Sequence, residues 1–146
     1  MKSEPKIRRV KLDISGSNEP VIYGIVASEP DYKLSLALNR KLGISLKNTA
    51  PVILQEENDN ELLFSRFSDS SNSSGLVYDL TSNRSGKSCL IRKMKNIDYF
   101  FQIHDIDNEP DAGWILSLLR ETDCITAVFN ITTDIIKDRN LKYLIR

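Results

Sequence analysis

The sequence has few of the residues on which metal and disulfide sites depend. It contains one histidine and two cysteines in 146 residues, and the cysteines form no CxxC pair. A zinc site needs about four ligands, so this set predicts no metal centre. Cys89 and Cys124 both lie in apolar runs, which favours buried, reduced thiols. We therefore expect a domain that folds without a metal ion, a cofactor or a disulfide.

Long hydrophobic runs and an excess of one charge are missing as well. No apolar stretch reaches about 18 residues and no leader-like segment is evident, so we expect a cytoplasmic protein without a membrane span. The chain has 20 Lys and Arg against 20 Asp and Glu, which argues against a general nucleic-acid binder. One local exception is a candidate nucleic-acid patch on a basic N-terminal strand, made of Lys6, Arg8, Arg9 and Lys11.

The length and composition that are present indicate one ordinary globular domain. Hydrophobic residues make up 40% of the chain and charged residues 27%, as is usual for such domains. We expect a single domain over residues 1–146, with 1–5 frayed and 68–75 forming a mobile hairpin loop.

Hydrophobic periodicity places the expected elements. Alternation predicts strands at 6–14, 21–27, 52–54, 61–68, 76–82, 87–92, 97–104 and 124–131. Helical spacing predicts helices at 29–42 and 111–121, which Ser28 and Asp111 would cap and the first of which Gly43 would end. The tail predicts a helical turn and a last short strand. Gly24, in the middle of the second strand, indicates a bulge or a close backbone approach.

These elements together predict the fold class. Strands and helices do not alternate regularly, and short turns join consecutive strands, which favours an antiparallel meander. We therefore expect a single α+β domain with a mostly antiparallel sheet of five to seven strands and two main helices. The aromatic residues lie on periodic apolar faces, so we expect them in the core and not on a base-stacking surface.

Two segments resemble catalytic or ligand-binding motifs but lack parts of them. Thr81–Ser88 ends like a phosphate-binding loop, yet Thr81 replaces the first glycine and a strand pattern follows, so a hairpin turn is expected. The acidic loop after His104 lacks the glycine and glutamate of a calcium loop, which favours a solvated turn. His104 has no recognisable nucleophile, because the sequence contains no Gly-x-Ser-x-Gly elbow. We expect no enzyme, and hence no catalytic, cofactor-binding or metal-ligating residues.

Two further segments resemble a known family. Residues 31–42, which begin with Asp31 and Tyr32, are similar to the early helix of the bacterial IPExxxVDY family. Residues 91–99, Ile-Arg-Lys-Met-Lys-Asn-Ile-Asp-Tyr, align with the motif that names it, although Arg92 and Lys93 replace its Pro and Glu. The resemblance implies a small bacterial cytoplasmic protein with no established activity and no catalytic residues to transfer. It makes Asp31, Tyr32, Asp98 and Tyr99 a candidate binding surface, with a structural role as the alternative.

The sequence thus predicts a non-catalytic protein-interaction or regulatory module, and a homodimer in particular. The dimer is expected because Leu62/Leu63 and Phe100/Phe101 place apolar residues on both faces of their strands. One alternative is an RNA-associated factor that uses the basic N-terminal strand. A second alternative is a small-ligand-binding domain with an apolar pocket between helix 29–42 and the sheet.

Overall fold

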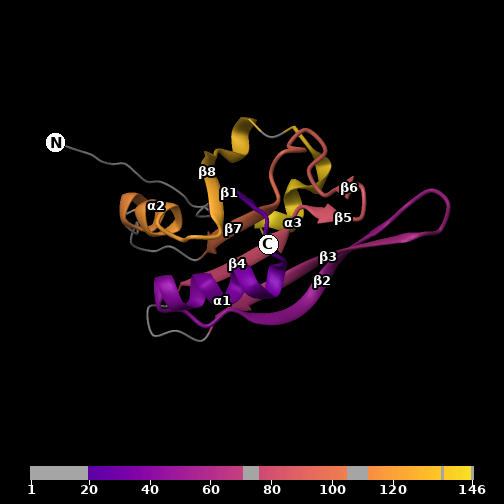
Figure 1. Ribbon diagram of the computed structural model, residues 1–146. Coiled ribbons are helices and arrows are strands. Elements are labelled where there is room, and N and C mark those ends of the chain that lie inside the picture. The colour runs from indigo at the N-terminus through magenta and orange to yellow at the C-terminus, as the bar shows by residue number, and fades with distance from the viewer. Residues whose placement is uncertain (1–19, 71–75, 105–111, 136, 146) are drawn as a thin grey trace.

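A computed structural model describes residues 20–70, 76–104, 112–135 and 137–145. Several predictions lie outside the described residues: the frayed residues 1–5, the strand at 6–14 with its basic patch, the acidic loop 105–111 with the cap at Asp111, and most of the hairpin loop 68–75. Six strands form an antiparallel sheet in the order β2-β3-β4-β7-β1-β8 (Figure 1). The strands are β1 Val21–Ala27, β2 Lys47–Gln55, β3 Glu61–Asp69, β4 Val77–Ser82, β7 Tyr99–His104 and β8 Ile125–Ile131. The predicted α+β class with a mostly antiparallel sheet is confirmed.

Smaller elements complete the fold. The helices are α1 Asp31–Leu42, α2 Ala112–Arg120 and the short C-terminal α3 Lys142–Ile145, and β5 Arg84–Ser85 pairs with β6 Ser88–Cys89 in a separate two-stranded sheet. The predicted strand at 87–92 is therefore wrong beyond Cys89, and the predicted last strand is replaced by 3-10 turns followed by α3. The expected hairpin turn at Thr81–Ser88 is confirmed, with Gly86 at φ 61° in the β5–β6 turn.

The sheet is a meander over only part of its width. β2, β3 and β4 follow one another, but β1 lies between β7 and β8, far along the chain. Gly24 sits in this central strand opposite Phe100 and Phe129. A Cβ added to Gly24 would lie 2.7 Å from Cδ1 of Ile131 and 3.0 Å from Cδ1 of Ile97. The predicted close approach is thus present at Gly24, and the bulge occurs later, between Val26 and Ala27.

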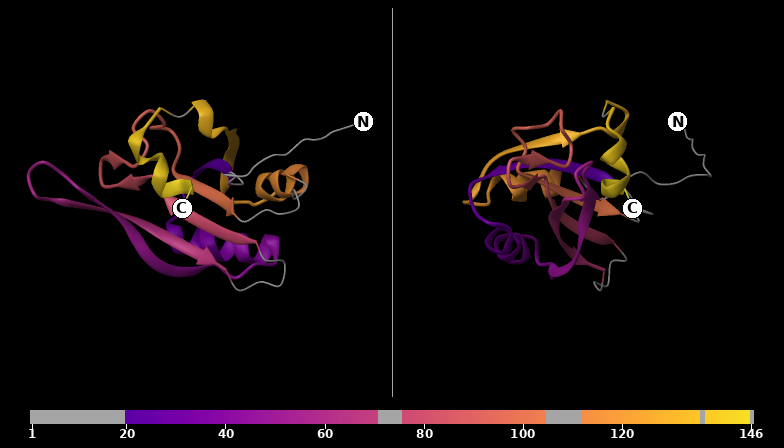
Figure 2. Two further views of the ribbon diagram at one scale, coloured as in Figure 1. Left: turned by 180° about the vertical axis from the view of Figure 1, so that it is seen from behind. Right: turned by 90° about the vertical axis from the view of Figure 1, so that its right-hand side faces the viewer.

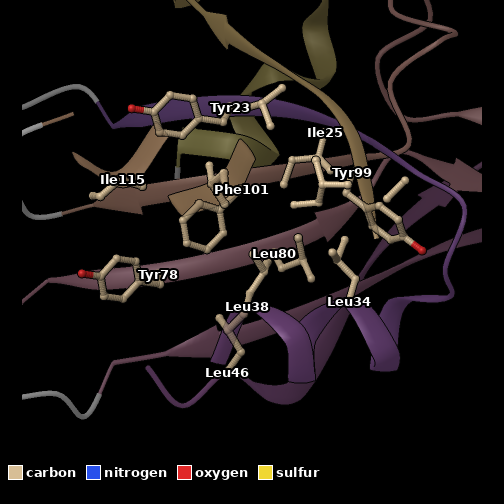
Figure 3. Packing of buried hydrophobic residues seen from close by; sticks show 14 of the residues in the cluster. Tyr23, Ile25, Leu34, Leu38, Leu46, Tyr78, Leu80, Tyr99, Phe101 and Ile115 are labelled. Atoms are coloured by element: carbon tan, nitrogen blue, oxygen red, sulfur yellow. The ribbon is translucent and has the colours of Figure 1, made fainter. Parts of the chain in front are cut away.

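The first hydrophobic core lies between the sheet and the helices α1 and α2. Leu34 and Leu38 of α1 extend toward Leu80 and Phe101 of the sheet (Figure 3). From α2, Ile115 and Leu119 are fully or almost fully buried in the same core, as expected from their spacing. These side chains pack together between the first helix and the sheet, where the second alternative expected an apolar pocket.

The second hydrophobic core covers the opposite face of the sheet. Its cover consists of residues 84–97 and of the C-terminal segment, residues 137–145. Both lie across the sheet from α1 (Figure 2). Leu90 and Ile91 of the first segment and Leu144 of α3 are fully buried there. Phe100 and Phe101 are also fully buried, one on each face of the sheet. They therefore give no support to the predicted homodimer, because one copy of the chain already covers them.

Helix α1 begins later than the sequence predicts. Pro30 is its N-cap, no side chain caps it, and the Pro30 carbonyl accepts from Lys33 and Leu34, so the predicted Ser28 cap is wrong. Gly43 ends the helix as predicted, with a left-handed φ of 70° and an N–H that donates to the Asn39 carbonyl.

Strand β2 is longer than the predicted 52–54. Its pairing with β3 shifts register between Thr49 and Val52, around Pro51. This shift interrupts the period-two pattern on which the sequence prediction depended.

Not all aromatic side chains lie in the core as expected. Tyr32 on α1 and Trp114 on α2 are each 54% exposed, and Phe129 on β8 is 48% exposed. Tyr32 lies two residues before the buried Leu34, on the exposed side of α1. These residues are available for contacts outside the fold.

Candidate functional site

Asp98, from the family-like motif, joins three parts of the chain. Its Oδ2 accepts a hydrogen bond from the Ala27 backbone N–H at 2.9 Å, and its Oδ1 lies 2.6 Å from Nε of Arg84. Its own backbone N–H donates to the Ile25 carbonyl at 2.9 Å. The carboxylate therefore fixes the end of β1 to β5 and the approach to β7.

Tyr99, the next residue of the motif, is buried beside this junction. Its hydroxyl donates to the Glu29 backbone carbonyl at 2.8 Å. Burial raises the pKa of Tyr99 to about 12, and the nearby carboxylates of Asp31 and Asp98 add to this effect. The phenol is therefore a hydrogen-bond donor that holds the β1–α1 connection against β7.

Two of the four residues of the predicted binding surface share a pocket, and Asp31 and Tyr32 are not part of its lining. Asp98 and Tyr99 line an open pocket of about 520 Å³ at the β1–α1 connection. Asp31 is in the first turn of α1, where its Oδ1 accepts from the Tyr32 N–H at 2.7 Å. The ring of Tyr32 is on the exposed side of the helix. The structure thus brings Asp98 and Tyr99 together and leaves Tyr32 apart from them.

A buried polar cluster lies on the second face of the sheet. Asp79 is fully buried, its Oδ1 accepts a hydrogen bond from the Ser68 hydroxyl, and its Oδ2 lies 2.9 Å from Nε2 of His104. The hydroxyl of Thr81 donates to Gln102 at 3.0 Å, and the Gln102 amide donates to the Leu144 carbonyl at 3.3 Å. The cluster therefore bonds largely within itself and to the end of α3.

The order of groups in this cluster determines its chemistry. A serine nucleophile needs an imidazole beside its hydroxyl to take the proton. Here the Asp79 carboxylate stands between Ser68 and His104, and the hydroxyl donates to the carboxylate. This arrangement joins strands β3, β4 and β7 through Asp79 and differs from the order Ser-His-Asp of a hydrolytic triad.

The sequence analysis missed this cluster, although a signal for it exists. Asp79 and Thr81 are two residues apart in β4, as are Gln102 and His104 in β7. Alternate residues of a strand share a face. Two polar pairs at this spacing, inside otherwise apolar strands, indicate buried side chains that bond to each other across the ladder.

A second feature that the sequence analysis missed is a basic pocket, defined here by Arg84, Lys87, Arg92 and Lys95. Residues 80–97 contain five Lys and Arg and no Asp or Glu. Four of the five line one pocket of about 560 Å³, together with Cys89, Asn140 and a single acidic residue, Glu56. A segment with five basic and no acidic residues, in a chain of zero net charge, was the sequence signal that could have predicted this pocket.

The described part of the chain offers no candidate metal site and no candidate membrane span. Within those ranges no group of three or more His, Cys, Asp or Glu side chains is placed to hold a metal ion. Among the same residues, no helix is sufficiently long and apolar to cross a bilayer. Cys89 and Cys124 are both free thiols and partly buried.

Comparisons with known proteins add nothing to this geometry. No protein-family model, curated protein or solved structure matches the chain. The resemblance of residues 31–42 and 91–99 to the IPExxxVDY family therefore stays a prediction, and functional proposals depend on the residues themselves.

Proposed function

We propose that this chain is a non-catalytic protein-interaction module that pairs with a second copy of itself through the outer edge of β8. The buried cluster supports the non-catalytic part, because Ser68 donates to Asp79 and not to His104. The two free thiols favour a reducing, cytoplasmic compartment. The proposal of self-pairing rests on one observation, the half-exposed Phe129 on an outer strand that carries no charge.

The two outer strands of the sheet differ in how they resist pairing. Strand β2 carries Lys47, Pro51 and a register shift, features that natural sheets use to block edge-to-edge association. Strand β8, with the sequence Ile-Thr-Ala-Val-Phe-Asn-Ile, has neither a charged residue nor a proline. In the described residues it pairs with β1 alone, so its other edge offers backbone donors and acceptors to a partner strand.

The residues of β8 favour a second copy as that partner. Antiparallel self-pairing centred on Phe129 would place the two Phe129 rings side by side and would set Ala127 opposite Ile131. Such a contact obeys two-fold symmetry, in which each copy uses its single outer β8 edge. The assembly therefore ends at a dimer and does not grow into a fibre. Trp114 is exposed on α2, the helix that packs against β8, and offers further apolar area near the same edge.

Light scattering and sedimentation across a range of protein concentrations test this proposal. We expect a reversible dimer that Phe129→Lys abolishes, because it would set two like charges opposite each other. Ile53→Lys is the matched control, since Ile53 is equally exposed (48%) on the other outer strand. We expect this variant to dimerise like the parent chain.

Two results would contradict the proposal. One is a parent chain that stays monomeric at every concentration. A monomer that retains RNA at low salt would count in the same way and would favour the RNA-associated alternative. The other is a dimer that Ile53→Lys disrupts and Phe129→Lys leaves intact. Both substitutions replace exposed side chains, so circular dichroism should show an unchanged fold.

A further inference from the structure

The basic pocket concentrates positive charge that the rest of the described chain does not neutralise. Arg84 is compensated, because its Nε lies 2.6 Å from Asp98 and its Nη2 donates to the Lys95 carbonyl at 2.6 Å. Lys87, Arg92 and Lys95 have no ion pair within the described residues. These three cations share the pocket lining with a single carboxylate, Glu56, so the lining keeps a net positive charge that a bound anion would offset.

The segment that carries these cations is fixed by buried polar contacts. Asn83 is fully buried, and its side-chain amide donates to the carbonyls of Met94 and Ile97, each at 2.9 Å. Its Oδ1 accepts from the Ile91 N–H at 2.8 Å. From the C-terminal segment, Asn140 donates to the Leu90 carbonyl at 2.9 Å. The backbone around the pocket is thus held in place before any ligand arrives, which lowers the entropic cost of binding.

The pocket lining also has an apolar part. Leu54 and Leu62 are cross-strand partners in β2 and β3, and both line the hollow. Cations and aliphatic groups in one lining suit a ligand with an anionic head and a nonpolar body. The volume of about 560 Å³ lies within the range of small-molecule sites, roughly 300–1,000 Å³.

We propose that the basic pocket binds an organic phosphate, with the phosphate held by Lys87, Arg92 and Lys95 and the organic part against Leu54 and Leu62. A phosphate is favoured over a carboxylate because it carries up to two charges and three acceptor oxygens for three cations. A small molecule is favoured over nucleic acid because the charges surround a hollow and do not follow an extended groove.

Calorimetry at constant ionic strength tests the site with hexyl phosphate, inorganic phosphate and hexanoate as probes. We expect hexyl phosphate to bind more tightly than either of the others, since only it supplies both the phosphate and the apolar chain. The double variant Arg92→Gln/Lys95→Gln should bind it at least about tenfold more weakly. Lys33→Gln/Arg40→Gln removes the same charge from exposed positions on α1 and should bind like the parent chain.

The two cysteines provide a measurement that needs no variant. Cys89 lines the basic pocket, whereas Cys124 lines a different one beside α1. Hexyl phosphate should slow alkylation of Cys89 by iodoacetamide and leave the rate at Cys124 unchanged. Three results would each overturn the proposal. The first is an equal alkylation rate at Cys89 with and without hexyl phosphate, and the second is equal affinity of the two double variants for hexyl phosphate. The third is tighter binding of a single-stranded oligonucleotide in this pocket.

Discussion

At the scale of single residues, Tyr99 shows how one side chain combines packing with a hydrogen bond. Its ring belongs to the first core, and its hydroxyl reaches the Glu29 carbonyl at 2.8 Å. Ionisation would remove the proton that makes this bond and would leave a charge in a largely apolar place. The raised pKa of Tyr99, mainly an effect of burial, expresses that cost.

This shift predicts how stability depends on pH. An ordinary tyrosine ionises at pH 10.0 and Tyr99 at about 12, so the unfolded chain loses its proton first as the pH rises. The stabilising contribution of Tyr99 is complete below pH 10 and is lost between about 10 and 12. Tyr99→Phe should therefore be less stable at neutral pH, by about 1 kcal/mol for the lost hydrogen bond, and should lose less stability over the alkaline window.

Urea unfolding at a series of pH values measures this difference. Tyr23 and Tyr78, whose pKa values burial also raises, are present in both proteins and cancel in the comparison. Parallel curves for Tyr99→Phe and the parent chain across the alkaline window would show that the Tyr99 phenol is not protected by the fold.

Individual functional residues were harder to predict than the elements that carry them. The motif resemblance singled out Asp98 and Tyr99, which the structure does place at a junction. The sequence offered no comparable motif for Asp79 or His104, because the 2.9 Å approach of their side chains depends on the pairing of β4 with β7. Trp114 and Phe129 fit apolar stripes, but about half of each side chain stays exposed.

At the scale of elements, the centre of the sheet depends on the absence of a side chain at Gly24. The space that its Cβ would need is occupied by the Cδ1 atoms of Ile131 and Ile97. Gly24→Ala should therefore destabilise the protein by about 1–3 kcal/mol, as overpacked cores do. Because both obstacles are the ends of side chains, Ile131→Val should relieve part of the strain by removing its Cδ1.

A double-mutant cycle with denaturant unfolding measures this coupling. We expect Gly24→Ala/Ile131→Val to cost less than the sum of the two single changes. Simple additivity would mean that the cost of Gly24→Ala arises elsewhere than in contact with Ile131.

Elements with regular patterns were predicted well, and those shaped by side-chain contacts were not. The pattern at 21–27 matches β1 and Gly43 ends α1 as expected, since local periodicity and capping decide both. Leu90 and Ile91 also carry a strand-like pattern, but their N–H groups donate to the backbone and side-chain oxygens of Asn83. A distant asparagine thus takes the place of a neighbouring strand, which a local pattern does not reveal.

At the scale of the whole molecule, the second core is closed by the end of the chain. Leu144 of α3 is fully buried there, and the carbonyls of Tyr143 and Leu144 accept hydrogen bonds from Arg66 and Gln102. This short helix therefore connects strands β3 and β7 on the face of the sheet that carries the second core.

Removing the buried side chain should affect the stability of the entire domain. Leu144→Ala is expected to lower the free energy of unfolding by about 2–5 kcal/mol, because it deletes a buried leucine and leaves a cavity. Ile145→Ala is the control, since Ile145 is 38% exposed, and should cost much less. Circular dichroism during denaturant unfolding measures both. Equal costs would indicate that α3 is not part of the cooperative unit.

The position of β1 between β7 and β8 has a consequence for synthesis on the ribosome. β1 leaves the exit tunnel before every other described strand, yet both of its partners belong to the last third or so of the described chain. The β2–β3–β4 meander can assemble early, whereas β1 must wait with two open edges and an apolar sequence until residues up to Ile131 have emerged. Apolar strand edges that stay exposed during this delay favour aggregation, so rapid translation up to Ile131 or a holding chaperone at that stage would protect the nascent chain.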